Sequence, residues 1–290
     1  MIKKIIKELL FPNFLKDQIN KIKINQGIKL SQSINEKNLE NIDELNFSIF
    51  SQFNEDAIIQ FLIQNLNIKN KKFVELGVEN YSEANTRFLL EKDNWDGLIV
   101  DSSKENIKYI KKQNYFWRHN IIALSSFINK ENINDILKKN LYSGEVGLLS
   151  VDIDGNDLWV WKEINQISPI ILVIEYNAKM GKEDSLSIKY DPNFQRESNG
   201  LEKLIYGASL KALTKISEDK GYSLVCTNKN GNNAFFVKND HLNKKIFKRS
   251  VSDCFKMSHF REYLKSDSNK EYRNDEILEF LFKNEKIQKI

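Results

Sequence analysis

From residue 72 to residue 175 the chain alternates between short apolar runs and longer segments with helical spacing. The apolar runs lie at 72–76, 97–101, 120–124, 147–152 and 170–175. Each run is short enough for a strand buried on both faces, and the gaps leave room for a covering helix. One such helix is expected to open at Asn129, with Ile133, Ile136 and Leu137 at helical spacing behind this capping residue. The alternation predicts a parallel sheet covered on both sides.

Further elements flank this alternation. A helix over SQFNEDAIIQFLIQNL precedes it, with Ile58, Phe61, Leu62 and Leu66 on one face. A helix over GASLKALTKISEDKG follows it and leads to the apolar runs YSLVCT and AFFVK, which the turn NKNGNN joins into a hairpin. We therefore predict a Rossmann-like α/β fold with a mostly parallel, seven-stranded sheet whose last strand is antiparallel.

The chain divides into three predicted segments. A helical N-terminal extension covers 1–50, a main domain covers 51–240, and a helical tail covers 241–290. Within the main domain, residues 177–200 are too polar and irregular for a helix or a strand. Because a loop of this length in a compact domain is usually functional, we predict that it closes over a substrate.

Composition narrows the classes of function. The 44 basic and 40 acidic residues give a formal charge of +4 without a basic cluster, which opposes nucleic-acid binding. No apolar run approaches the roughly 20 residues of a transmembrane segment. The start, MIKKIIKELLF, lacks a signal-peptide cleavage site; we expect a helix on the core or on a partner subunit of a homo-oligomer rather than on a membrane surface. Cys226 and Cys254 form neither a metal motif nor a disulfide framework, as expected in the cytoplasm.

The first candidate site follows the run at 72–76. There VELGVENYSEANTR ends a strand at Glu75, turns at Gly77 and enters a helix near Asn85 and Thr86. A glycine lets a cofactor approach the backbone, and a helix start offers N–H groups to a carboxylate. We assign these four residues to a cofactor site. The GxGxxG pattern of dinucleotide folds is missing, which opposes NAD.

Asp101 ends the second predicted strand, and Ser102 follows it. An acidic side chain at this place can accept both hydroxyl hydrogens of a ribose, as in Rossmann-like folds that bind adenosine cofactors. We assign both residues to cofactor binding. The alternative is that Asp101 caps the next helix.

The stretch LLSVDIDGNDLWVW gathers Asp152, Asp154 and Asp157 where a buried strand emerges. In strand geometry, Asp152 and Asp154 share a face with Cα atoms about 6.6 Å apart, which suits a divalent cation with oxygen ligands. Glu175, at the end of the next strand, can complete a site for Mg²⁺ or Mn²⁺ or contact the acceptor. The alternative is that Asp157 only caps a helix and Asp152 alone is functional.

Later segments supply residues for the second substrate. We assign to an acceptor pocket Asn177, Tyr206, Ser209, Asn232 and Asn233. Ser209 alternatively caps its helix. If no cation binds the acidic residues, Lys179 and Lys182 are available to neutralise them.

A family resemblance spans seven ordered blocks between residues 51 and 240: VELGVENYSEANTR, GLIVD, SFINKENIN, LLSVDIDGNDLWVWK, VIEYNA, YGASLKAL and NAFFVK. Together they resemble FkbM-type S-adenosylmethionine-dependent methyltransferases, in particular a bacterial group found with surface-polysaccharide (capsule) biosynthesis. The resemblance implies the class I methyltransferase fold, S-adenosylmethionine as cofactor and O-methylation. Glu75, Gly77 and Asp101 match the family's cofactor positions. Asp152 matches its acidic residue after the fourth strand, and we assign it to cofactor binding as well.

The positions of the histidines bear on how an O-methyltransferase would remove the hydroxyl proton. His119 precedes the third strand and His241 follows the hairpin, so both should lie at the opposite end of the sheet; His259 lies in the tail. This arrangement favours a carboxylate base or a metal-bound hydroxyl, with the three acids at 152, 154 and 175 as catalytic residues.

The leading hypothesis is O-methylation of a sugar or sugar-linked group in capsule biosynthesis, a substrate class that rests on the resemblance. The alternatives are methylation of a phosphoramidate or another small glycan decoration, a nucleotide-sugar-modifying enzyme of another reaction class, and a non-catalytic binding or scaffold protein. The missing dinucleotide motif opposes another reaction class that uses NAD, and the clustered acids oppose a scaffold.

Overall fold

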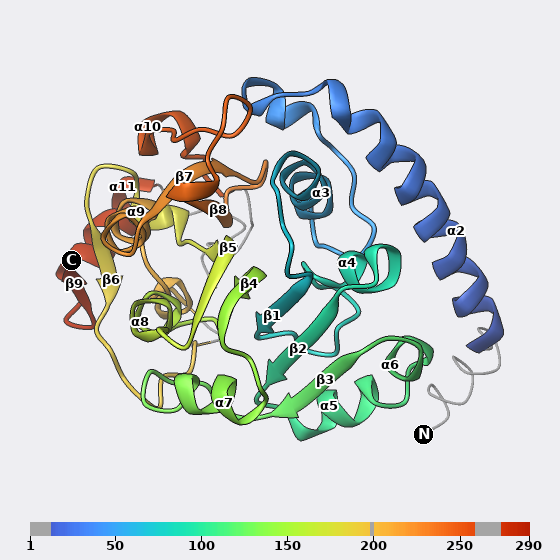
Figure 1. Cartoon of the computed structure of the whole chain (residues 1–290). Helices are drawn as coiled ribbons and strands as arrows, with labels where there is room; N and C mark the ends of the chain where they lie inside the picture. Colours follow the sequence, from blue (N-terminus) through green and yellow to red (C-terminus); the bar gives the residue numbers. More distant parts are fainter. Residues whose placement is uncertain (1–12, 198–199, 259–273) are drawn as a thin grey trace.

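Seven strands form one sheet in the order β3-β2-β1-β4-β5-β8-β7 (Figure 1). The computed structural model describes residues 13–197, 200–258 and 274–290. The strands are β1 (Lys72–Leu76), β2 (Asp96–Asp101), β3 (Ile121–Ser125), β4 (Gly144–Val151), β5 (Ile167–Glu175), β7 (Tyr222–Thr227) and β8 (Asn233–Lys238). The first five pair in parallel, whereas β8 runs antiparallel to β5 and β7. This topology confirms the predicted fold class, including its antiparallel last strand.

Helices cover both faces of the sheet because its strands are apolar on both sides. The helices are α3 (Glu55–Asn65), α4 (Arg87–Asp93), α5 (Lys104–Ile110), α6 (Asn114–Arg118), α7 (Ile133–Lys139), α8 (Asp157–Glu163) and α9 (Leu210–Asp219). Successive side chains of a strand point to opposite faces. Phe73 thus packs in the core beneath α3, α4 and α5, and Val74 packs in the core beneath α7, α8 and α9. Figure 1 shows α3 and α4 on one side of the sheet and α8 and α9 on the other.

Helix α7 begins at Ile133, later than the predicted start at Asn129. The side chains of Asn129 and Asn132 each accept a hydrogen bond from the other's backbone N–H, at 3.0 Å. These bonds hold a turn ahead of the helix, so Asn132 occupies the N-cap position and the predicted cap at Asn129 is three residues early.

The predicted β-hairpin is formed by β7 and β8. Its turn depends on Asn228, whose Oδ1 accepts hydrogen bonds from the backbone N–H groups of Gly231, Asn232 and Asn233. Gly231 has a φ of +75°, a conformation that side chains oppose. The turn residues therefore determine where β8 starts and carry Asn232 and Asn233 to the edge of the sheet.

The N-terminal extension packs against the main domain. Helix α2 (Asn13–Gln32) runs along the outside of α4 and α3 (Figure 1), and two short 3-10 helices, η1 (Ser33–Glu36) and η2 (Leu39–Glu44), follow it. Ile34, Leu39 and Ile42 are buried in the same core as α3. The predicted helix over the first eleven residues lies outside the described residues. Within the described ranges, no helix is long and apolar enough to cross a membrane.

The C-terminal tail joins the segment that we predicted to be an irregular loop. That segment contains η3 (Ala178–Met180) and the strand β6 (Leu186–Ile188), and β6 pairs antiparallel with β9 (Ile287–Lys289). The predictions of a loop without regular structure and of a purely helical tail are therefore wrong at these strands. Each strand has only three residues and a partner about a hundred residues away, so neither carries a recognisable pattern of its own.

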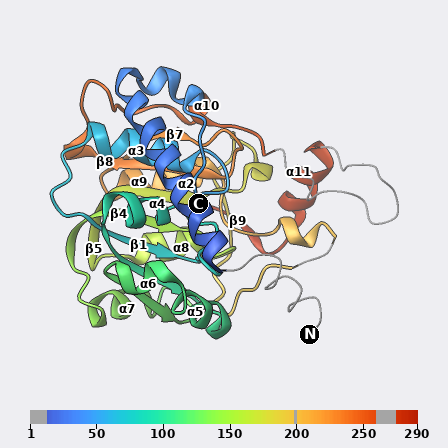
Figure 2. The ribbon, with the colours of Figure 1, turned by 90° about the vertical axis from the view of Figure 1, so that its right-hand side faces the viewer.

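Two helices complete the tail. Helix α10 (Val251–Cys254) lies over β7, and α11 (Asn274–Lys283) packs on η3. Ile277 and Leu281 of α11 are fully buried in a small separate core with Met180, Ile188 and Leu204. Figure 2 shows α11 at one end of the molecule, outside the layers formed by the sheet and its covering helices.

Candidate active site

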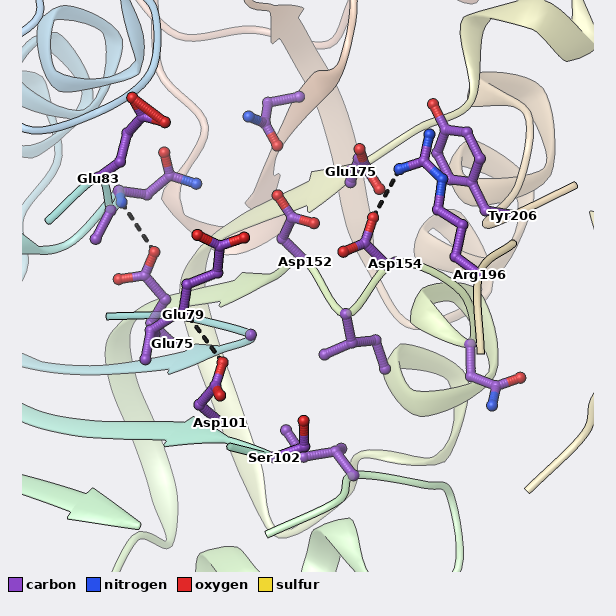
Figure 3. A pocket seen from close by; sticks show the side chains of 18 of the residues that line it. Glu75, Glu79, Glu83, Asp101, Ser102, Asp152, Asp154, Glu175, Arg196 and Tyr206 are labelled. Carbon is purple, nitrogen blue, oxygen red and sulfur yellow. Dashed lines mark hydrogen bonds and ion pairs between the residues drawn. The ribbon is translucent and has the colours of Figure 1, made fainter. Parts of the chain in front are cut away.

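A cavity of about 390 Å³ lies where β1, β2, β4 and β5 end. Ligands of open α/β sheets bind at this edge, because the loops that follow parallel strands diverge there. Figure 3 shows its two sides: Glu75 and Asp101 lie on one, and Asp152, Asp154 and Glu175 face one another on the other.

The buried side chain of Glu75 is hydrogen-bonded to the loop that follows β1. Its Oε1 accepts the backbone N–H of Asn85 at 2.8 Å, and its Oε2 accepts the backbone N–H of Thr86 at 3.1 Å together with the Thr86 hydroxyl. Burial raises the pKa of Glu75 to about 7, and the hydrogen bonds from Thr86 and Asn85 oppose that rise. Asn85 lines the cavity, but Thr86 is fully buried and does not, so we reassign Thr86 to positioning Glu75.

Gly77 lies where the β1 loop crosses the end of β4. Its φ is +81°, and a Cβ atom there would lie 1.6 Å from the backbone oxygen of Asp152. Only glycine fits this conformation and this contact. At this crossing the backbone of Gly77 lines the cavity directly. The predicted close approach of a cofactor to this backbone needs such an arrangement.

The carboxylate of Asp101 is partly engaged by hydrogen bonds from the protein. Its Oδ2 accepts the backbone N–H of Glu79 at 2.8 Å, and its Oδ1 accepts the backbone N–H of Ser103 and the side-chain amide of Asn106. Ser103, not Asp101, caps α5. Of the roughly four lone-pair sites of a carboxylate, three are used, which leaves room for one hydroxyl donor and not for the two that we predicted. Asp101 and Ser102 both line the cavity.

An apolar wall next to Asp101 was missed by the sequence analysis. Phe127 and Ile128, which follow β3, line the cavity beside Ser126. These residues belong to the block SFINKENIN and lie at the end of a predicted strand, so their position at the sheet edge was a usable signal. They offer the kind of surface on which an aromatic ring packs.

The three predicted catalytic acids come together. One carboxylate oxygen from each of Asp152, Asp154 and Glu175 lies within 4.8 Å of the others. Asp157 holds their loop, because its carboxylate accepts the backbone N–H groups of Ile153 at 2.8 Å and Gly155 at 2.9 Å. Asp157 therefore folds back on the loop as a structural residue, and Asn156 takes the N-cap position of α8.

Burial and mutual repulsion together disfavour the charged forms of this cluster. Burial, followed by the charges of Asp157 and Asp154, raises the pKa of Asp152 well above its usual range. Burial and the charge of Asp152 do the same to Glu175. Asp154 is 60% exposed and has a φ of +56°, a conformation that Asp tolerates better than most residues. A cation at this place would relieve the repulsion.

Arg196 supplies the positive charge that the sequence analysis sought in Lys179 and Lys182. Its Nη1 lies 2.7 Å from Asp154 Oδ1, and its guanidinium lies 3.6 Å from the centre of the Tyr206 ring (Figure 3). Lys179 instead donates to the backbone oxygen of Ser258 at 3.0 Å. No feature of the sequence distinguished Arg196 from other basic residues of its loop.

The five predicted acceptor residues fall into two groups. Tyr206, Asn232 and Asn233 line the cavity. Asn177 is fully buried and donates to the backbone oxygens of Leu204 and Tyr206, so it shapes the chain behind the cavity. Ser209 caps α9 by accepting the backbone N–H of Ala212, and it too is fully buried. We therefore reassign Asn177 and Ser209 to structural roles.

His119 and His241 lie away from the cavity, as predicted. His119 contacts Asn94, which precedes β2, and His241 lies 3.6 Å from Glu145 near the start of β4. Both contacts belong to the edge of the sheet opposite the site. His259 lies outside the described residues.

Comparisons with known proteins give only distant similarities. No model of a protein family and no curated protein matches the sequence. A putative caffeoyl-CoA O-methyltransferase from Staphylococcus aureus is 15% identical, with 75% of this chain and 99% of that chain covered and a TM-score of 0.42. An O-methyltransferase from Bacillus cereus in complex with SAH is 10% identical, with coverages of 74% and 88% and a TM-score of 0.37. Because these TM-scores are low, the fold assignment rests on the strand order and strand directions described above.

Proposed function

We propose that the protein is an S-adenosylmethionine-dependent O-methyltransferase. The observation that carries this proposal is the cavity at the ends of β1 and β2, which is lined by the backbone of Gly77 and by the carboxylate of Asp101. Phe127 and Ile128 stand beside them at the end of β3, where an adenine ring would pack. Adenosine cofactors of Rossmann-like folds bind at this edge of the sheet.

The cofactor and the cavity complement each other in charge. S-adenosylmethionine supplies a methyl group on a positively charged sulfur. Glu75, Asp101 and Asp152 place carboxylates around this charge, and the positive sulfur would in turn favour the ionised forms of the buried Glu75 and Asp152. The protein's own task is to hold the acceptor oxygen in line with that methyl group and to take up the hydroxyl proton.

We assign proton removal to the cluster of Asp152, Asp154 and Glu175. The three oxygens lie close enough together that the cluster could hold Mg²⁺ or Mn²⁺, and a cation bound there would acidify the acceptor hydroxyl. Glu175 Oε2 has no hydrogen-bond partner among the described residues, although it is buried. This unpartnered oxygen supports the presence of a ligand at the cluster.

The acceptor is assigned to the side of the cavity near Tyr206, Asn232 and Asn233. Amide and hydroxyl groups of this kind bind sugar hydroxyls through hydrogen bonds. The assignment to a sugar or sugar-linked group of a surface polysaccharide is supported by the family resemblance.

Calorimetric titration with S-adenosylmethionine, S-adenosylhomocysteine and NAD tests the cofactor. We expect the first two to bind and NAD not to bind. Asp101→Ala should weaken S-adenosylmethionine binding at least tenfold, since a charge-assisted hydrogen bond contributes about 1.5 to 3 kcal/mol. Ser103→Ala is the matched control, because it removes the α5 cap and keeps the carboxylate. Equal losses in both variants would reduce Asp101 to a structural residue.

Removal of divalent ions tests the cation. We expect turnover to stop after exhaustive EDTA treatment and to return with Mg²⁺ or Mn²⁺. Asp154→Asn should require a higher ion concentration for the same recovery. Full activity in EDTA would refute the cation and leave Asp152 as the general base.

A further inference from the structure

The lining of the cavity is strongly unbalanced in charge. Among the described residues it contains seven carboxylates and one basic side chain: Glu75, Glu79, Glu83, Asp101, Asp152, Asp154 and Glu175 against Arg196. Arg196 is already engaged, because it pairs with Asp154 and lies over Tyr206. A divalent cation at the acid cluster would leave an excess of carboxylates. Even without Glu75, Asp152 and Glu175, whose pKa values are raised, the four other carboxylates outnumber Arg196, so the cavity opposes an acceptor with a net negative charge.

Unpartnered atoms in the same wall indicate the hydrogen-bonding character of the ligand. Outside the acid cluster, two buried oxygens of cavity residues have no partner among the described residues: Asn156 Oδ1 and Asn233 Oδ1. Asn156 and Asn233 are 3% and 4% exposed. Both of these atoms are acceptors, and a buried acceptor without a donor is unfavourable. A ligand rich in hydrogen-bond donors would satisfy them.

The orientation of the two amides is determined by the protein. Asn156 Nδ2 donates to the backbone oxygen of Asp191 at 2.7 Å, and Asn233 Nδ2 donates to Glu55 Oε1 at 3.1 Å. Turning either amide over would place its oxygen against another oxygen, so the Oδ1 atoms remain the unpartnered ends. Glu175 and Asn233 are also register partners across β5 and β8, which places their side chains next to each other on one face.

We propose that the acceptor residue enters this cavity as a neutral or ammonium-bearing sugar that carries no phosphate or carboxylate. This inference rests on the proposed function and narrows its acceptor class. It favours a phosphate-free unit of a glycan over a nucleotide-linked sugar or a phosphoramidate. The hydroxyl and ammonium groups of such a sugar are donors, and donors are what the unpartnered oxygens require.

Transfer of a labelled methyl group to fractionated host extract tests the inference. The protein is incubated with methyl-labelled S-adenosylmethionine and with the two fractions that an anion-exchange column gives. We expect at least tenfold more label in the fraction that the column does not retain. Pretreatment of the extract with phosphatase and pyrophosphatase should leave that yield unchanged. Label only in the retained fraction, lost after this pretreatment, would overturn the inference and leave the proposed function intact. Label in neither fraction would count against both.

Reversal of one charge at the edge of the cavity tests the charge of the acceptor independently. Glu83 is exposed at the cavity edge and has no part in the proposed chemistry. Glu83→Lys should raise the KM of an ammonium-bearing acceptor severalfold and leave that of a neutral acceptor unchanged, with Glu83→Gln as the control for loss of the charge alone. A KM lowered by Glu83→Lys would identify an anionic acceptor and overturn the inference.

Discussion

Replacement of Gly77 by alanine should break the crossing on which the cofactor side of the cavity depends. Two costs combine at this position. The left-handed conformation at φ +81° costs an alanine about 1 to 2 kcal/mol. The added Cβ would also lie 1.6 Å from the backbone oxygen of Asp152, whereas non-bonded atoms in contact lie about 3.5 Å apart. The end of β1 and the end of β4 must therefore separate.

Separation of these ends puts two backbone hydrogen bonds at risk. Gly77 N–H donates to Val100 at 2.9 Å, and Asp152 N–H donates to Leu76 at 3.0 Å. Each bond contributes about 1 kcal/mol to stability. Together with the conformational cost, Gly77→Ala should lower the free energy of unfolding by about 3 to 4 kcal/mol. Urea unfolding measures this loss, and calorimetry should show weaker S-adenosylmethionine binding in the variant.

Gly221 provides a matched control for the conformational cost. Its φ is +83°, and no atom lies within 4 Å of the position that a Cβ would take. Gly221→Ala should therefore lower the free energy of unfolding only by the cost of the left-handed conformation, about 1 to 2 kcal/mol, and should keep its cofactor affinity. If both variants were equally stable, the close contact between Gly77 and Asp152 would not exist in solution.

Three further predictions test the reassigned and newly found features. Ser209→Ala should lower the free energy of unfolding by about 1 kcal/mol through loss of the α9 cap, with an unchanged acceptor KM; a raised KM would return Ser209 to the acceptor pocket. Ile277→Ala should loosen the small core between α11 and the β6 segment, at a cost of about 2 to 5 kcal/mol, and impair turnover while calorimetry shows normal cofactor binding; a parallel loss of both would place α11 on the cofactor side. The pKa of Glu75 is about 7 in the folded protein and 4.5 ordinarily, so the folded state binds more protons between these values. The free energy of unfolding should therefore fall as pH rises from about 4.5 to about 7, and Glu75→Gln should flatten this slope in urea titrations; an unchanged slope would mean that Glu75 is ionised throughout.

The sequence alone was sufficient for the sheet and for the acids at its edge. Buried parallel strands are continuous apolar runs, so β1, β2, β4 and β5 could be located within a few residues. Because such strands end together, residues that follow them meet at one edge. The convergence of Asp152, Asp154 and Glu175 could be predicted on this ground.

Only the tertiary structure decided which polar residues of the later segments face the cavity. Nothing in the sequence separates Asn177 and Ser209 from Asn233. The side chains of Asn177 and Ser209 are hydrogen-bonded to backbone groups, whereas Asn233 lines the site. Arg196 and the pairing of β6 with β9 likewise depend on contacts between distant parts of the chain. A local pattern of hydrophobic and polar residues reports burial along one element. It carries no information about which distant backbone group will satisfy a given side chain, and that choice separates structural from functional polar residues here.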